Sequence, residues 1–73
     1  MKRIDIVAEV AGRVWKIEVR AGAQLAADES IFILESMKME IPVVAPPARR
    51  LLELRVNEGD TVHEGDVVAV VAV

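Results

Sequence analysis

The sequence predicts an all-β fold, a flattened barrel or sandwich of two antiparallel four-stranded sheets related by a pseudo-two-fold repeat, in a single domain over residues 1–73. Short apolar runs of strand length alternate with turn residues along the chain. No segment carries a sustained apolar stripe of 3.6-residue period, so no substantial helix is expected. The chain also repeats itself, without gaps, at an offset of 37 residues.

The repeat matches apolar positions and glycines of the two halves. Matched pairs include Ile6 with Val43, Ala8 with Ala45, Val14 with Leu51, Val19 with Val56, Gly22 with Gly59, Leu25 with Val62, and Ile31 with Val68. A half built of short strands cannot bury its apolar face alone. The two halves are therefore expected to pack on one another around a two-fold axis.

The strands are expected, in chain order, at residues 4–8, 12–19, 24–25, 30–35, 39–44, 50–56, 61–62 and 66–72. The inward pattern slips at the same place in both halves, because Val14 to Ile17 and Leu51 to Leu54 are steps of three rather than two. A shared bulge explains both slips. Trp15 is expected to cover a sheet face or edge.

Turn residues separate these strands. Gly22, Gly59 and Gly65 stand where the chain is expected to reverse, and Pro46-Pro47 should end the fifth strand. In the repeat, Asp28 stands at the position equivalent to Gly65, and Arg49 stands at the position equivalent to Gly12. If those positions need positive φ, each replacement of glycine costs about 1 kcal/mol.

Composition excludes several classes of protein. The net charge of −3 gives no reason to expect nucleic acid or an anionic membrane as partner. No apolar run approaches the ~20 residues that span a bilayer, and no signal-peptide core follows the N-terminus. Absence of cysteine permits a reducing compartment, and we expect a cytoplasmic monomer. His63 is the only histidine, so we expect no metal site.

A tight hairpin is predicted between residues 31–34 and 39–44, with Met37 and Lys38 at its tip. The expected cross-strand pairs are Ser36 with Met39, Glu35 with Glu40, and Leu34 with Ile41. Met-Lys lacks the Asn or Gly that two-residue hairpin turns favour, so local preference did not select it. Exposed methionines beside an amine suit recognition. The two-fold repeat should place Lys38 at the end opposite both termini.

The stretch Glu35-Ser36-Met37-Lys38-Met39-Glu40 resembles the attachment motif of biotinyl domains, the biotin carboxyl carrier proteins of biotin-dependent carboxylases. In that family the lysine between two methionines carries biotin. The similarity covers essentially the whole chain and is closest to short, free-standing biotin/lipoyl attachment proteins. It implies covalent biotin on Lys38 and ligase recognition through the five flanking residues Glu35, Ser36, Met37, Met39 and Glu40.

The resemblance also implies partners and a non-enzymatic role, with no catalytic residue in this chain. An ordinary lysine has less than about 1% free amine at neutral pH, and nearby carboxylates favour its charged form. A biotin protein ligase would therefore supply biotinyl-adenylate and assist deprotonation. The biotinylated hairpin would carry carboxybiotin between the biotin carboxylase and carboxyltransferase sites of a carboxylase.

Two other functions stay open. A lipoyl carrier of a 2-oxoacid dehydrogenase-type system, with lipoate as cofactor, shares the fold, but its lysine usually follows Asp and precedes Ala. An unmodified β-sandwich adaptor would use the hairpin only for docking and would function normally with Lys38→Ala. Two departures from the family pattern are Ala8-Glu9, where Ala-Pro is common, and the absence of the protruding loop of some biotin carriers.

Overall fold

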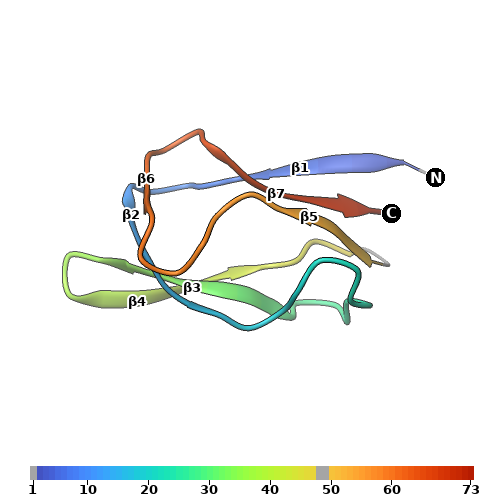
Figure 1. The fold of residues 1–73 in the computed structure, drawn as a ribbon, viewed down its shortest axis with the longest axis horizontal. Helices are drawn as coiled ribbons and strands as arrows, with labels where there is room; N and C mark the ends of the chain where they lie inside the picture. The colour runs from blue at the N-terminus through green and yellow to red at the C-terminus, as the bar shows by residue number, and fades with distance from the viewer. Residues whose placement is uncertain (1, 48–49) are drawn as a thin grey trace.

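The computed structural model describes residues 2–47 and 50–73, which form two antiparallel sheets (Figure 1). One sheet has the order β4 (Met39–Val44), β3 (Ser30–Ser36), β2 (Gly12–Ile17) and β6 (Thr61–Val62). The other has the order β1 (Arg3–Val7), β7 (Val67–Ala72) and β5 (Arg50–Leu54). The all-β prediction is confirmed. Across these two ranges no helix is long and apolar enough to cross a membrane.

The prediction of four strands per sheet holds for the sheet that contains β3. In the other sheet the described residues form three strands and one isolated bridge, between Gln24 and Arg50. This bridge is the repeat counterpart of the pair that joins Thr61 of β6 to Arg13 of β2. The other pair between β2 and β6 joins Gly12 to Val62, and its repeat equivalent would join Arg49 to Leu25. Arg49 lies outside the described residues, so the expected cost of replacing glycine there stays a prediction.

Backbone hydrogen bonds reproduce the repeat. The matched donors and acceptors are Ala8 N to Asp66 O and Ala45 N to Glu29 O, both at 2.9 Å, and Val14 N to Asp60 O and Leu51 N to Ala23 O, at 2.8 and 2.9 Å. The shared bulge is also confirmed, because the register shifts between Val14 and Lys16 in β2 and between Leu51 and Glu53 in β5. The two halves are therefore equivalent in backbone as well as in sequence.

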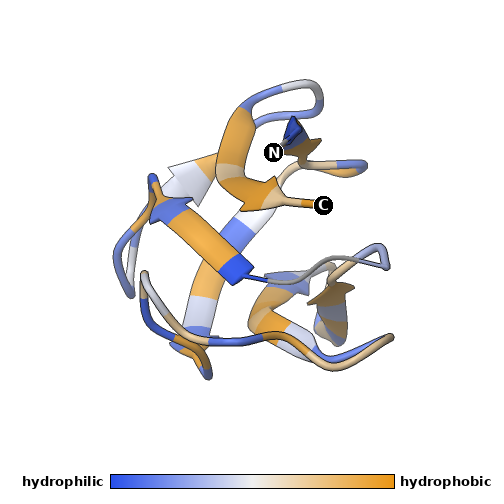
Figure 2. Cartoon of the chain, turned by 90° about the vertical axis from the view of Figure 1, so that its right-hand side faces the viewer, coloured by the Kyte–Doolittle hydropathy of each residue, from blue (hydrophilic) through white to orange (hydrophobic). Residues whose placement is uncertain are grey.

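The core lies between the sheets and is almost entirely aliphatic. In a view along the long axis, the strands of the two sheets lie around a common interior, and most of the hydrophobic segments are in these strands (Figure 2). The largest fully buried side chains of this core are Val14, Ile31, Phe32, Leu34, Leu51, Val68 and Val71. β3 and β7 each have a hydrogen-bonded neighbour on both sides. Most of the core therefore comes from the inner strands of the two sheets.

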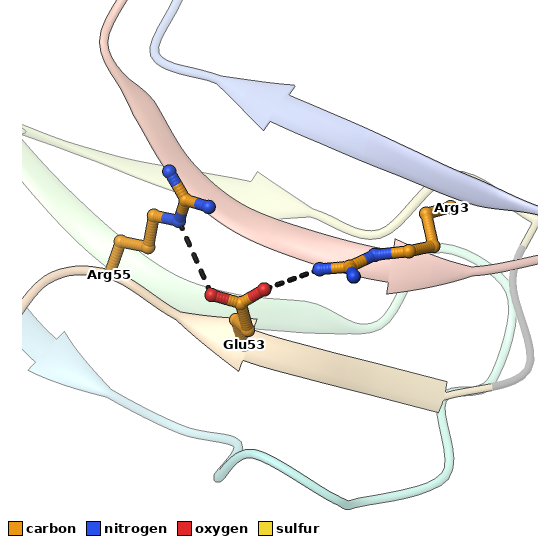
Figure 3. Close-up of polar contacts among 3 residues, drawn as sticks. All are labelled: Arg3, Glu53 and Arg55. Carbon is orange, nitrogen blue, oxygen red and sulfur yellow. Dashed lines mark hydrogen bonds and ion pairs between the residues drawn. The ribbon is translucent and has the colours of Figure 1, made fainter.

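The outer face of β7 is covered by charged side chains rather than by a further layer. Val70 pairs with Glu53 of β5, and both Val70 and Ala72 are almost fully buried. Arg3 of β1 reaches across β7 to the Glu53 carboxylate, which also receives Arg55 Nε at 3.5 Å (Figure 3). The aliphatic stems of such residues can cover apolar surface while their charges stay hydrated.

Two strands end earlier than predicted, β2 at Ile17 and β5 at Leu54. The reason in β2 is a shared acceptor, because the amides of Glu18 and Val19 both donate to Ile31 O, at 2.9 and 3.2 Å. A regular ladder offers each carbonyl to one amide, so this bend terminates the strand.

The turns follow the predicted positions. Gly22, Gly59 and Gly65 all have positive φ, and Asp28 has φ 61°, in the same region as its repeat counterpart Gly65 at 91°. The need for positive φ at position 28 is thus confirmed, and Asp is one of the residues that tolerate it.

Substitution of Gly12 tests how closely β2 and β3 pack. A Cβ at this position would lie 2.6 Å from the backbone oxygen of Glu35 and 3.0 Å from Leu34 Cγ. A backbone atom within a ladder cannot move aside cheaply. Gly12→Ala should therefore lower the free energy of unfolding by roughly 1–3 kcal/mol, measured by urea denaturation. Ala11→Ser, at the exposed neighbouring position, is the control, and equal midpoints for both variants would contradict the prediction.

Candidate functional site

The β3–β4 hairpin has the predicted register. Ser36 pairs with Met39, Glu35 with Glu40, and Leu34 with Ile41, which leaves Met37 and Lys38 as the two turn residues. The last pair between β2 and β3 joins Arg13 to Glu35. Only Ser36 to Met39 therefore extend beyond the last residue pair with β2, so the strands are held by three-strand pairing up to the base of the turn.

Both turn residues have left-handed backbone conformations, with φ 51° at Met37 and 65° at Lys38. Positive φ at both central residues is what a type I′ hairpin turn requires, and it is why such turns favour Asn-Gly. Residues with a Cβ are disfavoured there by about 1 kcal/mol each. Residues held in such conformations cluster at functional sites. The Met-Lys turn therefore has a cost in stability that the fold does not explain.

The side chains of the turn point into solvent. Met37 is 92% exposed and Met39 64%, so neither methionine fills the core. Lys38, Glu35 and Glu40 are also exposed, whereas Ser36 is half-buried. Throughout residues 2–47 and 50–73, neither an ion pair nor a side-chain hydrogen bond engages Lys38. Its amine is therefore presented to solvent rather than used to neutralise the two carboxylates below it.

The hairpin occupies one end of an elongated molecule whose principal extents are 36, 19 and 17 Å. The chain ends lie together at the opposite end, where Val73 N donates to Lys2 O at 2.9 Å (Figure 1). The prediction that Lys38 lies opposite both termini is confirmed.

Sequence reasoning did not identify a hollow that adjoins the hairpin. It has a volume of about 350 Å³ and is lined by Arg13, Val14, Trp15, Glu35, Glu58 and Gly59. Trp15, which was expected to cover a sheet face or edge, is the extra residue of the β2 bulge and is 50% exposed. The repeat marks the residues of this hollow, because the other half has different residues at most of these positions, but it does not show that they meet in the folded chain.

The structure is a two-fold β sandwich that presents one lysine on an exposed turn with two positive φ angles. The family model described as "Biotin-requiring enzyme", of the biotin/lipoyl type, matches residues 3–71. The chain belongs to this family, and the resemblance inferred from its motif is confirmed.

Individual relatives agree with this placement. The chain is 49% identical over 59 residues to the "Biotin/lipoyl attachment protein" of Bacillus subtilis, covering 81% of each chain. It is 38% identical over 68 residues to the "Biotinylated protein TB7.3 homolog" of Mycobacterium leprae, covering 93% of this chain and 96% of the other. The crystal structure of Kluyveromyces lactis urea carboxylase matches with a TM-score of 0.89 and 31% identity, over 97% of this chain and 6% of that one.

The strain at the turn can be measured. Met37→Asn introduces a residue that tolerates left-handed backbone, so we expect the free energy of unfolding to rise by roughly 0.5–1 kcal/mol. Met39→Asn, made two residues away at the start of β4, has no positive φ to relieve and should give no gain. Urea denaturation of both variants checks this, and a Met37→Asn protein no more stable than the unchanged chain would contradict it.

Proposed function

We propose that this chain is a biotin carrier whose attachment point is Lys38. In this proposal a biotin protein ligase modifies Lys38, and the hairpin then carries a carboxyl group between biotin carboxylase and carboxyltransferase sites. The observation that carries the proposal is the position of Lys38, alone on an exposed type I′ turn at the end of the sandwich opposite both termini. Membership of a family described as biotin-requiring supports biotin as the group.

The residues around Lys38 fit a covalent amide. The ε-amine has no competing partner among the described side chains, so bond formation breaks no existing contact. Nζ attacks the carbonyl carbon of biotinyl-adenylate, AMP leaves, and the amine proton passes to the ligase. The ligase must provide the base, because no side chain of the described residues forms a hydrogen bond or an ion pair with the Lys38 amine. When bound, biotin supplies a ureido nitrogen that can hold a carboxyl group.

The neighbours of Lys38 have two roles in this proposal. Met37 and Met39 offer exposed, flexible apolar surface that a ligase can grip, while Glu35, Ser36 and Glu40 present polar groups at fixed register positions. The sandwich itself holds the turn and increases the local concentration of the attached group at each site. The chain contributes presentation and does not itself catalyse the reaction.

The geometry suits delivery into recessed active sites. A two-residue turn is the narrowest end that a hairpin can have, and a sandwich 19 by 17 Å across follows behind it. We extend the proposal to a monomer that acts in the cytoplasm, supported by the absence of cysteine and by the charged residues on the sheet edges. Arg3 and Asp5 on β1 are examples of such edge charges, which discourage pairing between copies.

Lipoate is the second candidate, because the matching family includes lipoyl as well as biotinyl domains. Met37 and Met39 favour biotin, and so does the Mycobacterium leprae relative, whose name describes a biotinylated protein. An unmodified adaptor would leave the strain at Met37 and Lys38 without a function.

The modification is tested by intact mass after incubation with a purified biotin protein ligase, biotin and ATP. We expect a gain equal to biotin minus one water, which peptide mapping should assign to Lys38. Lys38→Arg should abolish the gain, because a guanidinium is not acylated.

Two other lysines provide matched controls. Lys16→Arg, on the neighbouring strand β2, and Lys2→Arg, at the opposite end of the molecule, should both be modified to completion. A lipoyl-sized gain in a host that makes both ligases would replace biotin by lipoate. No gain with ligase and biotin in excess would refute both carrier functions.

A further inference from the structure

Because the two halves of this protein share one backbone fold, comparing equivalent positions separates residues that the fold requires from residues that it does not. Residues that the fold requires should be similar at equivalent positions, as Val14 and Leu51 are. A cluster that differs between the halves, and that lies only beside the hairpin, calls for another explanation. The hollow next to Glu35 is such a cluster.

Three of the side chains that line the hollow have no counterpart of similar chemistry. The repeat matches Trp15 with Leu52, Glu35 with Ala72, and Glu58 with Ala21. The other three lining residues are kept or similar, because Arg13 is matched by Arg50, Gly59 by Gly22 and Val14 by Leu51. The region beside the hairpin therefore carries an indole on β2, a carboxylate on β3 and a carboxylate in the loop between β5 and β6 that the equivalent positions of the other half lack.

The bulge is what exposes the indole. Val14 and Lys16 pair with consecutive residues of β3, and Trp15 between them is left out of the ladder. Bulges of this kind redirect a side chain and are frequent beside functional sites. Trp15 is 50% exposed, whereas Leu52, the bulged residue of the other sheet, is only partly exposed.

The far wall of the hollow is fastened to β2. Glu58 Oε2 accepts a hydrogen bond from Ile17 N at 3.0 Å, and Gly59 N donates to Val14 O at 2.8 Å. The loop is closed further by Asp60, whose carboxylate accepts from Asn57 N at 2.8 Å. A hollow with fixed walls loses little entropy when it is filled, which favours binding.

The hollow is complementary to a cationic side chain. It contains two carboxylates and one guanidinium, and within the described part of the chain none of Arg13, Glu35 and Glu58 forms an ion pair. An indole face attracts a guanidinium or ammonium placed over it. Two acids beside an accessible tryptophan therefore favour an arginine or lysine from another protein.

Its position relates the hollow to Lys38. Glu35 lines the hollow and precedes Lys38 by three residues on the same strand and turn. Because even a fully extended chain spans no more than about 3.6 Å per residue, the hollow begins within about 11 Å of the lysine backbone. A protein that held the hollow would thus hold the turn in a fixed place.

We propose that this hollow is a docking site for a basic side chain, an arginine or lysine, of the biotin protein ligase. This inference rests on the proposed function. Acyl transfer needs the amine aligned with the activated carboxyl, and a contact on the rigid sheet beside a narrow turn supplies that alignment. Trp15 forms the base of the contact, with Glu35 and Glu58 neutralising the incoming charge.

The test compares initial rates of biotinylation by the purified ligase. Trp15→Leu copies the residue of the other half, and Glu58→Gln removes the charge but keeps an oxygen that can accept from Ile17 N. We expect kcat/KM to fall about tenfold for Trp15→Leu and about threefold or more for Glu58→Gln. Glu58→Gln should also weaken the dependence of the rate on salt concentration.

The other half supplies the controls. Leu52→Ala and Glu53→Gln change the corresponding sheet and should leave kcat/KM within about twofold of the unchanged chain, since rim and remote positions are near neutral. All variants should still reach complete biotinylation at long times. If instead the unchanged chain were never biotinylated, the proposed function itself would fail, which distinguishes the two failures.

A second measurement does not depend on turnover. Trp15 is the only tryptophan, so a chain labelled with 5-fluorotryptophan gives one ¹⁹F resonance, and Lys38→Arg prevents modification during the experiment. Addition of ligase should shift this resonance, and Glu58→Gln should weaken the titration. No shift at saturating ligase, equal rate losses in both halves, or losses confined to carboxylation after normal ligation would each overturn the proposal. Urea midpoints confirm that each variant is folded.

Discussion

The structure depends on the mutual burial of two equivalent apolar faces. A chain of 73 residues has little interior, and a half of that length could not exclude water from its strands by itself. Ile31 and its counterpart Val68 are both fully buried at matched positions of β3 and β7. The contact between the halves is thus the condition under which either half has a fold. This explains why the backbone hydrogen bonds repeat more faithfully than the surface residues do.

That rigid framework makes the unusual turn tolerable in a small domain. Two consecutive residues with positive φ and a Cβ destabilise the hairpin by about 2 kcal/mol together, a substantial part of the roughly 5–15 kcal/mol that stabilises a typical domain. Leu34, buried just below the turn, and the pairing of Glu35 with Arg13 fix the strands before the strain begins. Strain that would otherwise melt the end of a hairpin is confined to Met37 and Lys38.

Much of the fold could be predicted because the repeat is a long-range signal written in the sequence. The repeat indicates the two-fold sandwich, the bulges that follow Val14 and Leu51, and the positive φ of Asp28. The hairpin register follows from apolar residues on either side of a short polar stretch. What could not be predicted depends on contacts between distant strands. The Arg3–Glu53 ion pair over β7 and the hollow beside Trp15 each join residues that are close only after folding.

The ends of strands are hard to predict for the same reason, because they depend on contacts with residues that are distant in the sequence. β2 stops at Ile17 because two successive amides share the carbonyl of Ile31, a residue on another strand, and no local pattern encodes that choice. The exposure of Trp15 escapes prediction for a related reason. A bulge can be inferred from a slip in periodicity, but the periodicity does not show how much of the extra side chain stays exposed.

The meeting of both chain ends at one pole of the molecule has an architectural consequence. A tether can be joined to either end, or to both, without approaching the reactive lysine at the other pole. Such a domain can serve as a self-contained cassette, used alone or spliced into a larger polypeptide without redesign. The similar fold within urea carboxylase, where the matched region makes up 6% of the chain, is what such portability would produce.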